Sequence, residues 1–262
     1  MRALGLAGCA FAACAIAPRV ASAEPPWVDR HIVLPEHDWS FDLGLGIQHD
    51  RFAPDDQPTG TGLNFEMAVS PVNRLELGIR SGLRIGDDGR ATQADEVGRL
   101  FDRQTFGTNN DVFANPEIRV RGALLEHPIV EIGLEGRVFL PAEQYSAFGF
   151  MVGLPFLFHI AGVARIDTGF FVPVVLYDPV QVYLSVPLDV WFQVTNRLWL
   201  GPETGIVFDA THDHAIAQLG FGLGYQILRN LDLKTQFLFP QISEPQGAQT
   251  FGFGVGIEVR IE

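Results

Sequence analysis

Apolar residues alternate with small or charged residues, without interruption, along positions 251–261 at the end of the chain. The apolar positions are Phe251, Phe253, Val255, Ile257, Val259 and Ile261, with glycine, glutamate or arginine between them. Successive side chains of a β-strand point to opposite faces, so this pattern predicts a strand with one wholly apolar face. In a soluble β-sandwich that face turns toward a core. In a membrane barrel it turns toward lipid, and the other face lines the lumen.

The same alternation continues through most of the 262 residues and predicts about twelve strands. We expect them at residues 38–48, 61–70, 74–85, 113–124, 129–140, 148–160, 164–176, 180–194, 197–208, 215–227, 230–239 and 250–261. Short turns and longer loops alternate between them, and this arrangement with an even strand count is typical of outer-membrane barrels. The predicted fold is therefore all-β: a single antiparallel up-and-down transmembrane β-barrel with short periplasmic turns and longer extracellular loops.

Residues 1–23 have the composition of an export signal. Arg2 precedes a stretch of small and apolar residues, and residues 21–23 form an Ala-x-Ala cleavage site. A lipoprotein signal at Cys9 is the alternative, but too few residues precede that cysteine to engage the export machinery. We expect a cleavable signal peptide at 1–23, an N-terminal periplasmic segment at 24–37 and an outer-membrane β-barrel at 38–262, in a Gram-negative bacterium.

Cysteine content and charge argue against two classes of protein. Both cysteines, Cys9 and Cys14, lie in the predicted signal peptide, so we expect a mature chain without a disulfide framework. Loss of Arg2 and Arg19 with the signal leaves 16 of the 18 basic residues against 31 acidic ones, a formal net charge of about −15. We do not expect so acidic a protein to bind nucleic acid.

The two faces of the predicted strands differ in chemistry. One face is apolar, for example at Leu43, Leu184 and Leu188, and the other carries most of the ionisable residues. Because an unpaired buried charge is costly, so many charged groups cannot share a dry sandwich core. Glycine also gathers on the charged side, where a solvent-exposed sheet would favour threonine or lysine. A crowded lumen explains both observations, so we favour a barrel over a secreted soluble β-protein.

Two groups of inward positions are candidate site residues. The first is a charge ladder on neighbouring strands, consisting of Glu66, Glu76, Arg80, Arg84, Glu117, Arg119, Arg121, Glu131, Glu135 and Arg137. Its arginines could dominate a field that sorts hydrated solutes, or the ladder could be a salt-bridge network that fills the barrel. The second is an apolar wall of Met151, Leu157, Phe171, Tyr183 and Trp191. This wall could hold a partly apolar solute, or pack against a folded N-terminal segment containing Trp27 and Trp39.

Sequence signals for enzymatic or metal chemistry are weak. His212 and His214 could offer two imidazoles to a metal, but no third ligand has a convincing spacing, and a polar loop tip explains them better. The acidic stretch 86–111 could bind divalent cations that bridge lipopolysaccharide, although a solvated loop explains its charge better. The sequence contains no nucleophile elbow, HExxH, P-loop or EF-hand spacing. We therefore expect no enzyme activity, no bound metal and no cofactor.

Two turn segments carry a resemblance to a known family. They read PVNRLELG at residues 71–78 and VTNRLWLG at residues 194–201. These units resemble the (T/S)-(D/N)-R-L-x-L-G turns of Gram-negative outer-membrane barrels, especially the transporter family named for phenol meta-pathway genes of aromatic degradation. The resemblance implies a barrel from about residue 38 to the end. One departure is the C-terminus, which ends Arg260-Ile261-Glu262 rather than on the aromatic residue that the insertion machinery usually reads.

The sequence therefore predicts an outer-membrane barrel that acts as a passive channel or transporter for small solutes. A structural or surface-interaction barrel with a sealed lumen is the main alternative. A membrane-embedded hydrolase comes third, and a secreted soluble β-protein is the alternative outside this class. The expected partners are outer-membrane lipid and lipopolysaccharide, the barrel-insertion machinery and an unidentified small solute.

Overall fold

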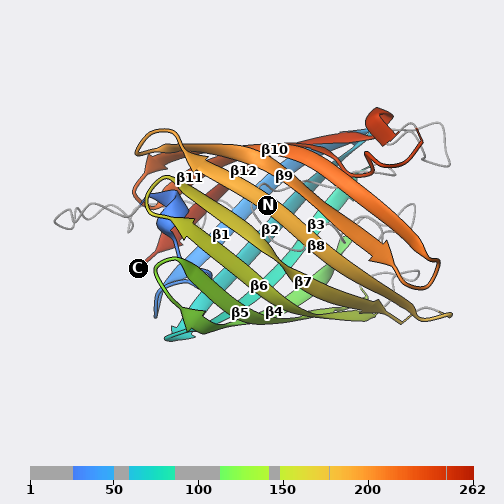
Figure 1. Cartoon of the computed structure of the whole chain (residues 1–262), viewed down its shortest axis with the longest axis horizontal. Coiled ribbons are helices and arrows are strands. Elements are labelled where there is room, and N and C mark those ends of the chain that lie inside the picture. Colours follow the sequence, from blue (N-terminus) through green and yellow to red (C-terminus); the bar gives the residue numbers. More distant parts are fainter. Residues whose placement is uncertain (1–25, 50–58, 86–112, 142–147, 177, 246) are drawn as a thin grey trace, which may run out of the picture.

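Twelve antiparallel strands close into a barrel (Figure 1). The computed structural model describes residues 26–49, 59–85, 113–141, 148–176, 178–245 and 247–262. The strands are β1 (Trp39–His49), β2 (Thr59–Val72), β3 (Leu75–Ile85), β4 (Phe113–Glu126), β5 (Val130–Phe139), β6 (Gly149–Ile160), β7 (Ala164–Val175), β8 (Gln181–Gln193), β9 (Leu198–Asp209), β10 (His214–Leu228), β11 (Leu231–Phe239) and β12 (Phe251–Ile261). The predicted strand boundaries differ from these by about two residues at most.

Pairing of the first strand with the last closes the sheet. β1 and β12 pair along their whole length, from Trp39 opposite Ile261 to His49 opposite Phe251. Every other strand pairs with its neighbours in sequence. A closed antiparallel barrel satisfies its backbone hydrogen bonds without an exposed edge, which is the condition for spanning a bilayer with strands. The predicted up-and-down transmembrane barrel is confirmed.

The two rims of the barrel differ in the length of their connections. At one rim, residues 73–74, 127–129, 161–163, 194–197 and 229–230 make tight turns. The repeated segments 71–78 and 194–201 both contain such turns, so their prediction as turns between strands is confirmed. The C-terminus lies at this short-turn rim, together with the 3₁₀ helix η1 (Trp27–Asp29) (Figure 1). The predicted short turns at one rim are confirmed, and the longest connections lie at the other rim.

The outer surface of the barrel is apolar and the inner surface is polar. Along β1, the outward side chains of Leu43, Leu45 and Ile47 are each about half exposed, while the intervening Gly44 and Gly46 are buried. Buried charged side chains, among them Glu135 and Arg137, point the other way. This is the inverse of a soluble protein and fits a lipid-facing exterior, so the predicted assignment of faces is confirmed.

Glycine inside the barrel makes room for large aromatic rings. A Cβ atom at Gly222 would collide with the Trp191 ring, and one at Gly224 would collide with the Trp199 ring. Trp199 of β9 thus packs on the neighbouring strand at Gly224 of β10, and Trp191 of β8 reaches past β9 to Gly222 of β10. The predicted crowding of the lumen explains these two glycines directly.

Helical structure in the described residues is confined to η1 and a second 3₁₀ turn, η3 (Gly247–Gln249). Within those residues, we find no helix with the length and apolar character needed to cross a membrane. The predicted signal peptide and the acidic stretch 86–111 lie outside the described residues, so both remain predictions.

Candidate functional site

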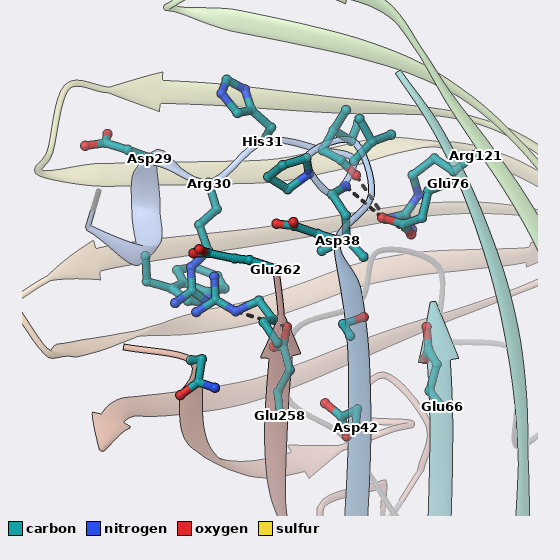
Figure 2. A pocket seen from close by; sticks show the side chains of 18 of the residues that line it. Asp29, Arg30, His31, Asp38, Asp42, Glu66, Glu76, Arg121, Glu258 and Glu262 are labelled. Carbon is teal, nitrogen blue, oxygen red and sulfur yellow. Dashed lines mark hydrogen bonds and ion pairs between the residues drawn. The ribbon is translucent and has the colours of Figure 1, made fainter. Parts of the chain in front are cut away.

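An N-terminal plug, which we define as residues 26–38, enters the short-turn end of the barrel (Figure 2). The Trp27 ring stacks on Trp199 with centroids 4.9 Å apart and contacts Trp191 edge-on at 5.4 Å. The guanidinium of Arg165 lies over the Trp27 ring, 4.8 Å from its centroid. Aromatic stacking and a partly desolvated cation–π contact thus anchor the start of the plug. The sequence predicted a periplasmic segment at 24–37, and the described part of it, from residue 26, docks against the inner wall.

Barrel side chains bind the plug through its backbone. Ile32 donates its N–H to Glu131 (2.9 Å), and Leu34 donates its N–H to Glu76 (3.0 Å). Three plug carbonyl oxygens accept hydrogen bonds, from His159 to Val28, from Arg165 to Arg30 and from Arg121 to Ile32. These contacts recur at every second residue, as expected for an extended segment whose alternate groups face one wall.

A plug side chain adds an ionic contact across the barrel. Arg30 donates two hydrogen bonds to Asp232 on β11, the shorter at 2.5 Å, and the Asp232 side chain is fully buried. Paired donation from one guanidinium to one carboxylate is the stronger and more directional form of this interaction. The plug is therefore fixed to β3–β7 by its backbone and to β11 by Arg30.

The predicted charge ladder forms a continuous chain of ion pairs. Its order is Arg80, Glu117, Arg137, Glu135, Arg121, Glu76, Arg119 and Glu66, with successive N···O distances of 3.9, 3.0, 2.5, 2.6, 3.9, 2.8 and 2.7 Å. Four arginines alternate with four glutamates, so the chain carries no net formal charge. Paired in this way, the arginines do not act as a separate cationic patch.

Among the described side chains of the predicted ladder, Glu131 lies apart from this chain of ion pairs. Glu131 is bonded to His31 of the plug at 2.7 Å and to His159 of β6 at 3.0 Å. The side chain of Arg84 lies outside the described residues. His31 and His159 were not among the predicted site residues. The signal available for His159 was a polar residue in phase with the inner face at the end of an apolar strand.

The predicted apolar wall divides into three clusters. Met151, Phe171 and Tyr183 pack together with other side chains toward the long-loop end. Trp191 packs against Trp27 of the plug, and Leu157 belongs to a cluster with Ile32 and Val33. The possibility that this wall packs against the N-terminal segment therefore holds for Trp191 and Leu157. It fails for Trp39, which lies on the outer face of β1 and stacks on Phe41.

A cavity of about 320 Å³ lies beside the plug. Its lining reaches from Arg229 and Asn230 in the β10–β11 turn to Glu66 and Arg119 in the lumen. Figure 2 shows the carboxylates of Asp42, Glu66 and Glu258 in this lining, on the adjacent strands β1, β2 and β12.

Lys234 of β11 joins two of the carboxylates that line the cavity. Its ammonium lies 2.5 Å from Glu258 and 3.3 Å from Asp42. The cavity wall is thus made largely of ionised groups of both signs. The plug leaves this polar cavity unfilled.

The two loop histidines do not share a site. His212 contacts Asp209 at 2.7 Å, and His214 contacts Glu244 at 2.7 Å. Both imidazoles are exposed, at the ends of the β9–β10 connection. Among the residues that the structure describes, no group of three or more His, Cys, Asp or Glu side chains is arranged to hold a metal ion.

Comparison with known proteins identifies the fold alone. No protein-family model matches the sequence, and the comparison with curated proteins found no match. Among solved structures, the NanC porin has a TM-score of 0.60 at 7% identity, covering 84% of this chain and 100% of that one. The KdgM porin has a TM-score of 0.57 at 9% identity and covers 85% and 99%. The COG4313 outer membrane channel from Pseudomonas putida F1 has a TM-score of 0.58 at 9% identity and covers 92% and 100%.

Proposed function

We propose that this protein is a passive outer-membrane channel for small hydrated solutes, driven only by the solute gradient. The observation that carries the proposal is the cavity beside the plug, which continues from the short-turn rim into the lumen. Its lining of paired acids and bases suits hydrated polar or ionic solutes rather than apolar ones. The fold is shared with proteins named as porins or channels, which supports the same class of activity.

The charge-balanced lumen sets the expected selectivity. Because each described arginine of the ladder lies next to glutamates, the fields of the two signs largely cancel beyond a few ångströms. We therefore propose weak selectivity between anions and cations in the parent channel. This replaces the expectation of a field dominated by arginines.

A sealed structural barrel is the second candidate function. The specific observation in its favour is the plug itself, which buries Trp27, Val28, Ile32 and Val33 against the inner wall. In that case the charge ladder is only a filling for the lumen. The two candidates differ in whether the cavity continues to the opposite rim.

The proposal also covers the cellular location of the protein and its relationship to a known family. We propose export by the signal peptide at 1–23, insertion by the barrel-insertion machinery and contact with outer-membrane lipid and lipopolysaccharide. The turn segments 71–78 and 194–201 support a relationship to the phenol meta-pathway transporter family. We also propose that the protein has no enzymatic activity.

Recording ion currents from refolded mature protein in a planar lipid bilayer tests the proposal. We expect stepwise currents in the parent. Lys234→Gln removes the cation between Asp42 and Glu258, so the cavity lining becomes more negative and the reversal potential shifts toward cations. Arg74→Gln is the matched control, because Arg74 pairs with Glu126 at the exposed rim and does not line the cavity.

The outcomes of this recording separate the candidates. A parent protein that folds but passes no current supports the sealed barrel. Equal reversal potentials for the Lys234→Gln and Arg74→Gln variants would show that ions do not follow the cavity.

A further inference from the structure

Three groups of the plug converge on one buried pair of barrel side chains, Glu131 and His159. Glu131 accepts a hydrogen bond from the Ile32 N–H at one carboxylate oxygen and contacts both His31 and His159 at the other. His159 contacts the Val28 carbonyl oxygen through Nδ1 at 2.9 Å and Glu131 through Nε2 at 3.0 Å. The side chains of Glu131 and His159 are only 1% and 6% exposed.

The hydrogen-bond partners of the two His159 ring nitrogens determine its protonation state in this arrangement. A carbonyl oxygen can only accept, and an ionised carboxylate such as that of Glu131 likewise only accepts. His159 must therefore donate from both ring nitrogens, and only the imidazolium form carries both protons. Neutral imidazole would leave either Val28 or Glu131 facing a nitrogen lone pair. A buried acceptor that loses its donor in this way is destabilised.

His31 provides a second proton-dependent contact to the same carboxylate. Its hydrogen bond to Glu131 raises the pKa of His31 above the ordinary value, although the imidazole is largely exposed. A raised pKa in the docked state means that this contribution to docking is complete below the ordinary histidine pKa. The contribution is lost as the pH rises through the raised value.

The surrounding charges belong to four parts of the chain. Those facing this group are Glu131 of β5, Arg165 and Asp167 of β7, Asp29 and His31 of the plug, and Glu126 and His127 near the β4–β5 turn. The acidic groups among them favour the imidazolium, and Arg165 opposes it. Arg165 is itself held by two hydrogen bonds to Asp167, so a nearby carboxylate offsets its charge.

We propose that the plug is a pH-sensitive gate, latched by protonated His159 and His31 on Glu131 and released when these histidines lose their protons. The latch holds the plug against the inner wall under acidic conditions and loosens it under alkaline ones, which widens the opening that the cavity already leaves at the short-turn end. Loss of the protons first weakens the contacts of the Val28 carbonyl and of the His31 ring, because these two groups bind the pair through the histidines. The carbonyl oxygens of Arg30 and Ile32 keep their hydrogen bonds from Arg165 and Arg121.

The consequence of release for transport rests on the proposed channel function, but plug docking can be measured without transport. The mature chain is expected to contain no cysteine, so a single introduced thiol can report on docking. Val33→Cys places a thiol where the parent side chain is 5% exposed, and Glu36→Cys places one at an exposed position of the same segment. The ratio of their reaction rates with an uncharged maleimide cancels the common pH dependence of thiol reactivity.

We expect the ratio of the labelling rate of Val33→Cys to that of Glu36→Cys to rise between about pH 5.5 and about pH 8.5. The rise should be about tenfold for each unit by which docking shifts the histidine pKa values. His159→Gln should reduce this rise, and the His31→Gln, His159→Gln double variant should abolish it. His127→Gln is the matched control, because His127 lies at the same rim and its ring accepts a hydrogen bond from Ile129 within its own turn. It should keep the full rise.

A ratio that stays constant with pH in the parent would overturn the latch, as would an unchanged rise in the double variant. Loss of the rise in His127→Gln would also count against it, because that histidine bonds within its own turn. Heat-modifiable migration of every variant checks that the barrel has folded. A labelling-rate ratio that depends on pH, without any bilayer current, would support the latch and contradict the channel. Bilayer currents together with a ratio that does not change with pH would support the channel and contradict the latch.

Discussion

The ionised side chains of the lumen stabilise the fold only as partners of one another. Glu135 is fully buried and accepts hydrogen bonds from Arg121 at 2.6 Å and Arg137 at 2.5 Å. Each of these arginines also lies next to a second glutamate, so the loss of one carboxylate affects several neighbours. Removing one partner of a buried pair leaves a desolvated charge, which costs more than the intact pair contributes.

We therefore predict that Glu135→Gln lowers the free energy of unfolding by about 3 to 5 kcal/mol, because Arg121 and Arg137 lose a shared carboxylate. Glu126→Gln is the control. Its partner Arg74 is half exposed, and such a surface pair contributes about 1 kcal/mol or less. Urea-induced unfolding from lipid vesicles measures both variants. Equal losses of unfolding free energy in the two variants would mean that water screens the lumenal ion pairs as well as it screens the Arg74–Glu126 pair at the rim.

At the scale of single elements, the strands could be predicted because the alternation that defines each strand lies within its own segment of the sequence. In β8, the alternation of Leu184 and Leu188 with Ser185 and Asp189 assigns each side chain to a face without reference to any other strand. The turns could be predicted for the same reason. The register of neighbouring strands then follows from the short turns that join them.

The plug could not be derived in this way, because its contacts are distant in sequence. Arg30 lies 202 residues from Asp232, and Ile32 lies 99 residues from Glu131. Residues 26–38 have no period that distinguishes an inserted segment from a free one. Trp27 and Trp39 look alike in the sequence, yet one stacks inside the barrel and the other faces outward. The histidine pair with Glu131 was missed for the same reason.

The lipid-facing side of β8 offers a test of orientation. Leu188 lies in the middle of the strand on the outer face, and Val194 lies just beyond its short-turn end. Leu188→Arg should destabilise the folded barrel by about 2 to 4 kcal/mol, because its guanidinium would sit near the bilayer midplane, and Val194→Arg by about 1 kcal/mol or less. Unfolding from vesicles measures the difference. Equal or reversed costs would contradict the assignment of lipid to this face.

At the scale of the whole molecule, the plug and the cavity divide the short-turn end between them. The plug contacts β3–β9 and reaches β11 through the Arg30–Asp232 pair. The cavity extends toward β1, β2, β11 and β12, where Lys234 pairs with Asp42 and Glu258 across strands. Both the plug and the cavity depend on a barrel wall that is closed between β1 and β12. If β1 and β12 were apart, the backbone groups of two strand edges would face lipid without hydrogen bonds.

Closure of the barrel can be tested by a pair of cysteines. Leu45 and Val255 face each other across the β1–β12 seam, and residues directly opposite in an antiparallel pair have Cα atoms roughly 4.5 to 5.5 Å apart. That separation lies within the range of about 4.4 to 6.8 Å that a disulfide spans. The double variant Leu45→Cys, Val255→Cys should therefore cross-link under mild oxidation once the protein has folded. Leu45→Cys with Leu188→Cys is the control, since β8 does not pair with β1. Non-reducing electrophoresis after boiling distinguishes the linked chain from the open one. If both pairs cross-link to the same extent, or the seam pair fails to link in heat-modifiable protein, β1 does not close against β12.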